Sequence, residues 1–287
     1  MGHQQRTIAF VLALLAAAFA ATPAFASAIV GRNVTGATLA IDSQGRAHVG
    51  YSAGGRRVTL VAWGAVNART PSRAVPQVTF QLRYGVAGGG VCLPYDGPAL
   101  AWLVEACKAP DGTYWALQSW QRLKPNYGGT EGPWELHLSH WSGLLAQLVI
   151  FQNWAPRGVR HIFGRLTYLG QGVHGFSSTP SGDPLDGYGR NIYVDTFDSA
   201  YGQGWHRANS VLTHGRGRTL GDFCYAFYRY GGHPRGNGTK YRATVEGPGV
   251  TPDVMWGAND IGRRLNRTLQ SRMQSLERSW GDPKCRV

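Results

Sequence analysis

Acidic, aromatic, imidazole and glycine residues are concentrated between positions 183 and 214. Within this segment, residues 191–197 have the β-branched and aromatic side chains typical of a half-buried strand. Alternate strand residues point to opposite faces, so Tyr193 and Asp195 share one face and Val194 lies on the other. Glycine-bearing loops flank the strand, and binding residues concentrate in such loops. We therefore expect a ligand site formed by Asp186, Arg190, Tyr193, Asp195, Trp205 and His206.

The expected role of Asp195 is to meet a ligand hydroxyl or cation, while Tyr193 and Trp205 supply apolar contacts. Arginines at 190, 207 and 229 would add a charged platform for stacking on sugars or an anionic polymer. The alternative interpretation is that the aspartates form turns, that the aromatic residues fill a core, and that Asp195 is paired inside the protein.

Carboxylates in and near this segment also suit glycoside hydrolysis, which needs two carboxyl groups about 5–10 Å apart. The candidates are Glu135, Asp183, Asp186, Asp195 and Asp198. A Ser–His–Asp arrangement can be drawn from Ser181, His206 or His214, and Asp195, but no Gly-x-Ser-x-Gly turn exposes a serine. The sequence identifies no catalytic residue, and an extracellular glycosidase or esterase stays an alternative to a binding protein.

Two sets of residues raise the question of a metal. Asp183 and Asp186, with nearby loop carbonyls, offer the oxygen ligands that Ca²⁺ prefers, although their spacing differs from that of an EF-hand. His137 and His140 lie in a strand predicted over Trp134–Trp141, where they point to opposite faces and do not share a metal. We therefore expect no cofactor, with Ca²⁺ as a minor alternative.

The charge of the chain indicates an anionic partner. Its 287 residues carry a formal net charge of +13, mostly from arginine. The planar guanidinium suits carboxylates, phosphates and sulfates, and it stacks on aromatic rings. No recognisable nucleic-acid motif is present. The charge predicts an acidic polysaccharide or another anionic envelope polymer as the partner, with solubility alone as the simpler explanation.

Residues 1–26 have the pattern of a secretory signal peptide: Arg6, an apolar run over 8–21, and the small-residue sequence Ala24-Phe25-Ala26. No later apolar run approaches the ~20 residues of a membrane-spanning helix. We therefore expect a protein that is secreted or associated with the cell envelope and has no transmembrane segment.

Export to an oxidising compartment makes two disulfides the expected state of the four cysteines. Four cysteines allow three pairings, and proximity in the sequence favours Cys92 with Cys107 and Cys224 with Cys285. A structural zinc site is less well supported, because none of the cysteines has a close Cys-x2-4-Cys or histidine neighbour.

Short strands separated by glycine-rich turns predict a mainly β fold, an antiparallel sandwich or barrel. A β-meander is expected within an N-terminal subdomain over 27–86, and a main β domain over 91–256, with the boundary in the glycine-rich stretch 85–90. Two helices are predicted. The first is a short one near 98–108, which Pro98 would open, and the second is a C-terminal amphipathic helix within 257–287, which carries an apolar stripe at three- and four-residue intervals.

Overall fold

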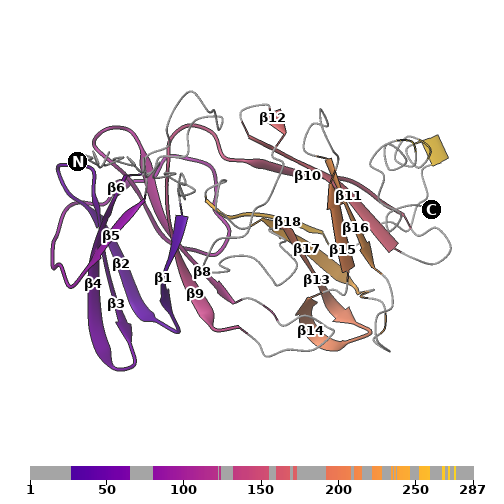
Figure 1. Cartoon of the computed structure of the whole chain (residues 1–287), viewed down its shortest axis with the longest axis horizontal. Helices are drawn as coiled ribbons and strands as arrows, with labels where there is room; N and C mark the ends of the chain where they lie inside the picture. Colours follow the sequence, from indigo (N-terminus) through magenta and orange to yellow (C-terminus); the bar gives the residue numbers. More distant parts are fainter. Residues whose placement is uncertain are drawn as a thin grey trace, which may run out of the picture.

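The computed structural model describes residues 27–64, 80–121, 123, 132–154, 160–168, 171–172, 192–207, 210–214, 222–227, 234, 236, 238–245, 252–258, 267–268, 271 and 275. This part of the chain is built almost entirely from β-strands in antiparallel sheets (Figure 1). In chain order the strands are β1 (Ser27–Arg32), β2 (Thr35–Ile41), β3 (Ala47–Ala53), β4 (Arg56–Trp63), β5 (Gln81–Tyr84), β6 (Leu93–Pro94), β7 (Leu103–Lys108), β8 (Tyr114–Gln121), β9 (Trp134–Trp141), β10 (Gln147–Trp154), β11 (Arg160–Tyr168), β12 (Gln171–Gly172), β13 (Ile192–Ser199), β14 (Gly202–Arg207), β15 (Ser210–His214), β16 (Asp222–Phe227), β17 (Lys240–Val245) and β18 (Val254–Ala258).

The strands form four sheets. Sheet 1 has the order β1-β9-β8-β7-β6, and sheet 2 has the order β2-β3-β4-β5. Sheet 3 has the order β10-β11-β16-β15, with β12 paired to β11, and sheet 4 has the order β14-β13-β17-β18. Sheets 1 and 2 share one hydrophobic core and form the N-terminal sheet pair, whereas sheets 3 and 4 share two smaller clusters and form the C-terminal sheet pair. The predicted mainly β, antiparallel architecture is therefore confirmed.

The N-terminal sheet pair begins with the predicted meander. Strands β2, β3 and β4 follow one another through tight turns in which Gly45, Gly54 and Gly55 have positive φ angles. Only glycine adopts such angles without steric cost. One face of the meander packs on the inner face of sheet 1, and the buried core residues from the two sheets include Leu39, Val49, Leu60, Trp115, Leu117, Leu136 and Leu138.

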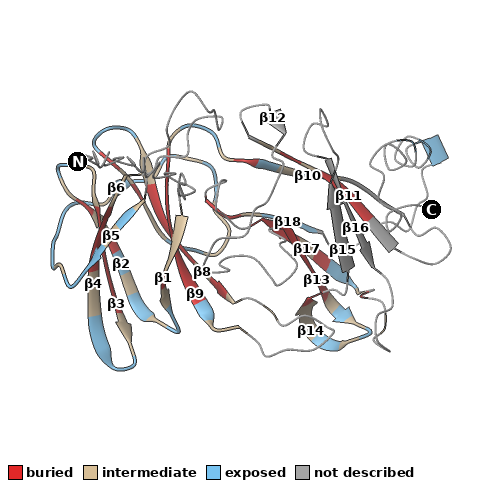
Figure 2. Cartoon of the chain, in the orientation of Figure 1, coloured by how far each residue is buried: buried red, intermediate tan, exposed pale blue. Residues whose placement is uncertain are grey.

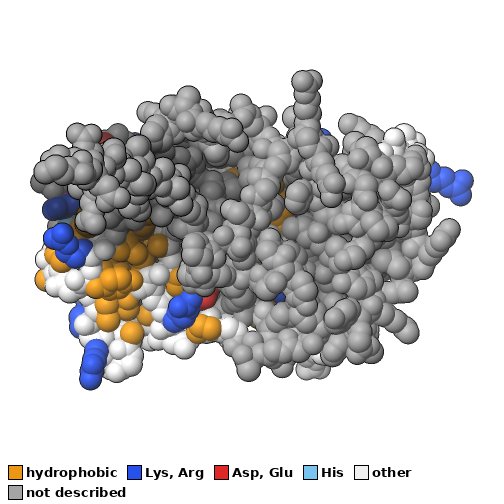
Figure 3. Space-filling model, viewed as in Figure 1, with side chains coloured by type: hydrophobic (Ala, Val, Ile, Leu, Met, Phe, Trp, Pro, Cys, Tyr) orange, Lys and Arg blue, Asp and Glu red, His pale blue; other side chains and the backbone are white. Residues whose placement is uncertain are grey.

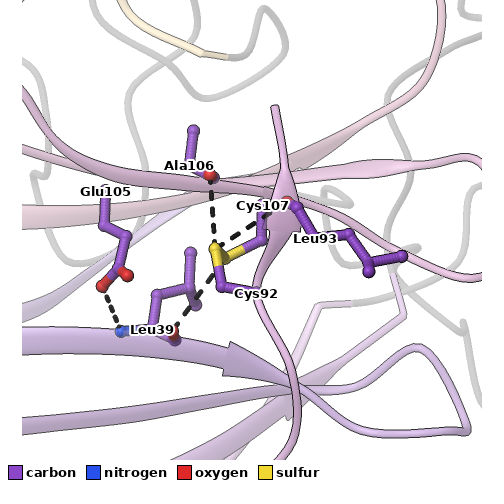
Figure 4. Close-up of a disulfide and its surroundings, with 6 residues drawn as sticks. All are labelled: Leu39, Cys92, Leu93, Glu105, Ala106 and Cys107. Carbon is purple, nitrogen blue, oxygen red and sulfur yellow. Dashed lines mark hydrogen bonds between the residues drawn. A yellow bond between two sulfur atoms is a disulfide. The ribbon is translucent and has the colours of Figure 1, made fainter. Parts of the chain in front are cut away.

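A disulfide joins Cys92 to Cys107, as the sequence predicted (Figure 4). It ties the residue that precedes β6 to the penultimate residue of β7. Beside it, the backbone N–H of Leu39 in β2 donates a hydrogen bond of 2.7 Å to Oε2 of Glu105 in β7. The disulfide and this hydrogen bond therefore hold together the edge of sheet 1 and the neighbouring strand of sheet 2. Cys224 lies in β16, but its predicted pairing with Cys285 lies outside the described side chains.

The predicted helix near 98–108 is wrong. Residues 103–108 form strand β7, and the preceding stretch from 95 to 102 has no regular structure. The apolar residues that suggested a helical face are divided between this stretch and the strand. Long-range contacts decide the outcome, because β7 pairs along β8 and Cys107 is fixed to Cys92. Helix propensity is a weak preference that such tertiary contacts override.

The C-terminal sheet pair confirms the predicted alternation along residues 191–197. Ile192 and Val194 of β13 point into the clusters that sheet 4 shares with sheet 3, where Leu148, Ile162 and Ala243 also lie. Tyr193 and Asp195 therefore point to the other side of sheet 4. Figure 2 shows the buried residues running along the middle strands of both sheet pairs.

Strand β1 pairs with β9, and Ile41 forms a bridge with Val91, so hydrogen bonds cross the stretch 85–90. The division into subdomains at this stretch stays a prediction. The signal peptide over 1–26 lies outside the described residues, as does most of the C-terminal segment, of which positions 267, 268, 271 and 275 are helical. Among the described residues, no helix has the length and apolar character of a membrane span.

Candidate functional site

The candidate site is centred on Asp195, which projects from the face of sheet 4 that is turned away from sheet 3. We call this the outer face of sheet 4. The strand register places Arg207 of β14 and Arg242 of β17 directly opposite Asp195 on either side. Arg207 Nε donates to Asp195 Oδ1 at 3.0 Å, and Arg242 Nε donates to Asp195 Oδ2 at 2.9 Å. Asp195 is only 2% exposed, so its carboxylate serves to fix two guanidinium groups.

Each of these arginines lies over an aromatic ring. The Arg207 guanidinium carbon is 4.0 Å from the centre of the Tyr193 ring, and both residues are buried. The Arg242 guanidinium carbon is 4.4 Å from the centre of the Trp205 ring and 5.8 Å from that of Trp102. These distances are within the range of cation–π attraction. Arg242 differs from Arg207 because its side chain is 19% exposed and Trp205 is half-buried.

Among the described residues, the outer face of sheet 4 carries more positive than negative charge. The guanidinium groups of Arg207 and Arg242 share the carboxylate of Asp195. Lys240 lies two residues before Arg242 in β17, on the same face of the sheet. It is exposed, and its Nζ is 5.0 Å from the centre of the Phe197 ring. Cations and aromatic rings thus alternate on a surface that an anionic ligand can approach.

No family model, curated protein sequence or solved structure matches this chain.

Trp102 connects the outer face of sheet 4 to sheet 1. It comes from the irregular stretch before β7 and has a φ angle of 48°, which is rare for a bulky side chain. Its ring stacks on Trp120 of β8, with ring centres 5.2 Å apart and an angle of 22° between planes. Backbone strain of this kind tends to occur at functional sites. The Arg242 guanidinium of the C-terminal sheet pair and the stacked indoles of the N-terminal sheet pair therefore lie next to each other.

Beyond Trp120 lies a polar cluster on the face of sheet 1 that is turned away from sheet 2, the outer face of sheet 1. The Trp120 indole N–H donates to Asp253 Oδ2 at 2.9 Å. His137 lies between two carboxylates, with Nδ1 3.4 Å from Asp253 Oδ2 and Nε2 3.4 Å from Glu135 Oε2. All of these residues are buried, so the cluster belongs to the layer between the two sheet pairs.

The two histidines of the predicted H-x-x-H pair lie on opposite faces of β9, as expected. His140 points into the core of the N-terminal sheet pair, where it stacks on Trp115 with ring centres 3.8 Å apart. Its Nδ1 lies 2.7 Å from the carbonyl oxygen of Gly64, so this nitrogen carries the proton and donates. Burial lowers the pKa of His140, and the Gly64 carbonyl and the Asp111 carboxylate oppose that shift.

Among the described residues, one group has the spacing of metal ligands, namely Cys92, Glu105 and Cys107. Its two sulfur atoms are joined in the disulfide, whereas a metal requires thiolates. This group therefore serves as a covalent link in the oxidised protein. The predicted calcium ligands Asp183 and Asp186 lie outside the described residues.

The structure brings together three of the six residues predicted for the site. Tyr193, Asp195 and Trp205 meet through the two arginines, with Tyr193 and Asp195 buried and Trp205 partly exposed. His206 points to the opposite face of β14, where its ring contacts the Gln203 carbonyl at 2.9 Å. Asp186 and Arg190 lie outside the described residues.

The sequence analysis missed Arg242 and Trp102. The sequence of β17 does contain a pattern that indicates Arg242. Polar residues alternate with apolar ones along this strand, and Arg242 lies between the buried residues Tyr241 and Ala243. No local signal indicated Trp102, whose position depends on how the irregular stretch before β7 crosses to the other sheet pair.

Proposed function

We propose that this chain is an exported, non-catalytic module of two β-sandwiches, one for each sheet pair, that binds a carbohydrate or an anionic envelope polymer. The observation that carries the proposal is the position of Arg242. Its guanidinium carbon lies 4.4 Å from the centre of the Trp205 ring and 5.8 Å from that of the Trp102 ring, and Asp195 holds it by a hydrogen bond, yet part of its side chain remains exposed.

This arrangement suits a polymer of charged sugars. An indole presents a broad apolar face on which the C–H face of a sugar ring packs, and its N–H remains available for hydrogen bonding. A guanidinium presents a planar fork that matches the oxygens of a carboxylate, sulfate or phosphate. Since Asp195 already orients Arg242, little side-chain entropy is lost when a ligand binds.

Binding is better supported than turnover. A carboxylate that acts as nucleophile or general acid has to reach the substrate, whereas both oxygens of Asp195 are engaged by arginines and the residue is buried. Export rests on the pattern of residues 1–26 and fits the disulfide, because disulfides persist in oxidising compartments.

The test is retention of the protein, produced without residues 1–26, on immobilised dextran sulfate, polygalacturonate and chitin oligosaccharides. We expect retention on at least one anionic polysaccharide at low salt and progressive release as salt screens exposed charges. The substitution Arg242→Gln should weaken that binding about tenfold or more, as expected for loss of a charge-assisted hydrogen bond.

Arg83→Gln is the matched control. Arg83 also lies near a tryptophan, 5.9 Å from the centre of the Trp63 ring, but it belongs to sheet 2 on the N-terminal sheet pair. The two variants lose the same charge from an arginine–tryptophan pair. If the proposal is correct, Arg83→Gln binds like the unaltered protein. Equal losses in both variants would indicate attraction to net charge alone, and no retention on any of the three polysaccharides would refute the proposal.

A further inference from the structure

The outer face of sheet 1 contains a row of buried polar atoms without hydrogen-bond partners. His137, Ser139 and Trp141 are alternate residues of β9 and therefore point to the same side. Ser139 Oγ and Trp141 Nε1 are buried and have no hydrogen-bond partner, whereas His137 Nε2 lies 3.4 Å from Glu135 Oε2. Buried polar groups in folded proteins are nearly always paired, so the two unpartnered atoms require an explanation.

A third such atom lies on the outer face of sheet 4. Thr244 of β17 is buried, and its Oγ1 has no hydrogen-bond partner. The register places Thr244 directly opposite Tyr193 on one side and Met255 on the other. Thr244 thus shares its face with Arg242 and belongs to the layer that Trp102 joins to sheet 1.

A pocket of about 380 Å³ opens beside this layer, at the boundary between the two sheet pairs. Ala101, Asp253 and Met255 are among its lining residues. Gln118 on the outer face of sheet 1 donates from Nε2 to the carbonyl oxygens of Ala101 and Asp253, each at 2.9 Å. The wall of the pocket therefore reaches His137 through Asp253 and Thr244 through Met255.

The irregular stretch from 95 to 102 lies over the same face of sheet 1. At one end, the Tyr95 ring packs against Trp141, with ring centres 5.9 Å apart. At the other end, Trp102 stacks on Trp120. This stretch has no backbone ladder of its own, so it is easier to displace than a paired strand.

We propose that the outer face of sheet 1 is a second subsite of the binding protein described above, and that it binds the hydroxyl groups of the same glycan. The inference rests on the proposed function. The ligand would enter by the pocket and replace contacts of the stretch 95–102. Ser139 and Trp141 are alternate strand residues, about 6.8 Å apart on one face, and sugar hydroxyl groups both donate and accept. A sugar chain that lies along β9 can therefore pair with the Trp141 indole N–H and the Ser139 hydroxyl.

The test uses Ser139→Ala and Thr244→Val, which remove one unpartnered hydroxyl each. The probes are the polysaccharide that binds most tightly among dextran sulfate, polygalacturonate and chitin oligosaccharides, and inorganic polyphosphate, which is anionic but carries no sugar hydroxyls. Each variant should weaken polysaccharide binding about five- to tenfold, the effect of one hydrogen bond. Binding of polyphosphate should not change, and the melting temperature should not fall, because no partner is lost within the protein.

Thr196→Val is the matched control. Thr196 is also buried with an unpartnered Oγ1, but it lies on the opposite face of β13 from Asp195. It should bind both probes like the unaltered protein. Unchanged polysaccharide binding in Ser139→Ala and Thr244→Val, or an equal loss of polyphosphate binding, would overturn the second subsite while leaving the Arg242 site intact. An unaltered protein that binds no polysaccharide would refute the proposed function itself.

Discussion

The two faces of sheet 1 are buried equally well but differ in chemistry. Leu138 on the inner face and Ser139 on the outer face are neighbours in β9, and both are 0% exposed. Leu138 belongs to an apolar core that continues into sheet 2. Ser139 belongs to a layer of polar and aromatic side chains in which several polar atoms lack partners. The inner face is built for stability, whereas the outer face keeps polar groups that the fold alone does not satisfy.

The outer face of sheet 4 shows that polar burial in this layer is not uniform. Some members of the layer, such as Asp195, are fully engaged by charged partners, and others, such as Thr244, are not. Where pairing is complete, removing one partner should destabilise the protein strongly. Where pairing is absent, removing the polar atom should cost little or should stabilise it. Substitutions in both regions test this contrast between the apolar core and the polar layer.

Asp195→Asn should have the largest effect. It leaves Arg207 and Arg242 without their shared carboxylate, and an orphaned buried charge of this kind costs about 3–5 kcal/mol of unfolding free energy. Urea unfolding measures the change. Asp96→Asn is the control, because Asp96 is exposed and pairs with Lys108 on the surface, where an ion pair adds little. A stable Asp195→Asn variant would show that the arginines do not depend on this carboxylate.

Leu138→Ala and Ser139→Ala compare the two faces of sheet 1 directly. Leu138→Ala should cost about 2–5 kcal/mol through lost burial and a cavity. Ser139→Ala removes a hydroxyl that has no partner, so it should leave stability unchanged or raise it slightly. The comparison uses the same strand, the same burial and the same final residue. Similar losses of unfolding free energy in both variants would mean that Ser139 contributes as much to stability as the apolar core residue Leu138.

Removing the disulfide should destabilise the N-terminal sheet pair. Cys92 and Cys107 are 15 residues apart, and a closed loop of that length contributes about 3 kcal/mol to stability in the chain-entropy model. The double variant Cys92→Ser and Cys107→Ser should therefore unfold at a lower urea concentration than the unaltered protein. An unchanged urea midpoint would show that the disulfide does not constrain the unfolded chain as the chain-entropy model requires.

The smallest effect should appear on mild acidification. Burial lowers the pKa of His140 in the folded protein, so the unfolded chain binds more protons below the ordinary histidine pKa of 6.5. The stability that depends on neutral His140 is present above about pH 6.5 and is lost as the pH falls below it. Urea midpoints at pH 7.5 and 5.5 should differ less in His140→Gln than in the unaltered protein. The same pH dependence in both would exclude His140 as its source.

Sequence patterns predicted strands better than they predicted the site. The alternation of apolar and polar residues predicted a strand over Trp134–Trp141, and the structure shows the same bounds. This prediction succeeded because the two-residue period of a strand is visible in the sequence itself. The stretch near 98–108 failed because a disulfide and strand pairing determine its conformation. The site depends on register between distant strands, and Arg242 meets Asp195 across 47 residues of sequence. Local pattern identified the face of β13 that matters, but strand order was needed to identify Arg242 and Trp102.

The central claim is that Arg242 binds the ligand through its planar, stacked guanidinium and not through charge alone. Isothermal titration with the polysaccharide that binds most tightly, performed on the unaltered protein and on Arg242→Lys, tests it most directly. Lysine keeps the charge but lacks the planar guanidinium that pairs with Asp195 and lies over the Trp205 ring. We predict that Arg242→Lys binds about tenfold more weakly, nearly as weakly as Arg242→Gln. An Arg242→Lys variant with the affinity of the unaltered protein would contradict the account.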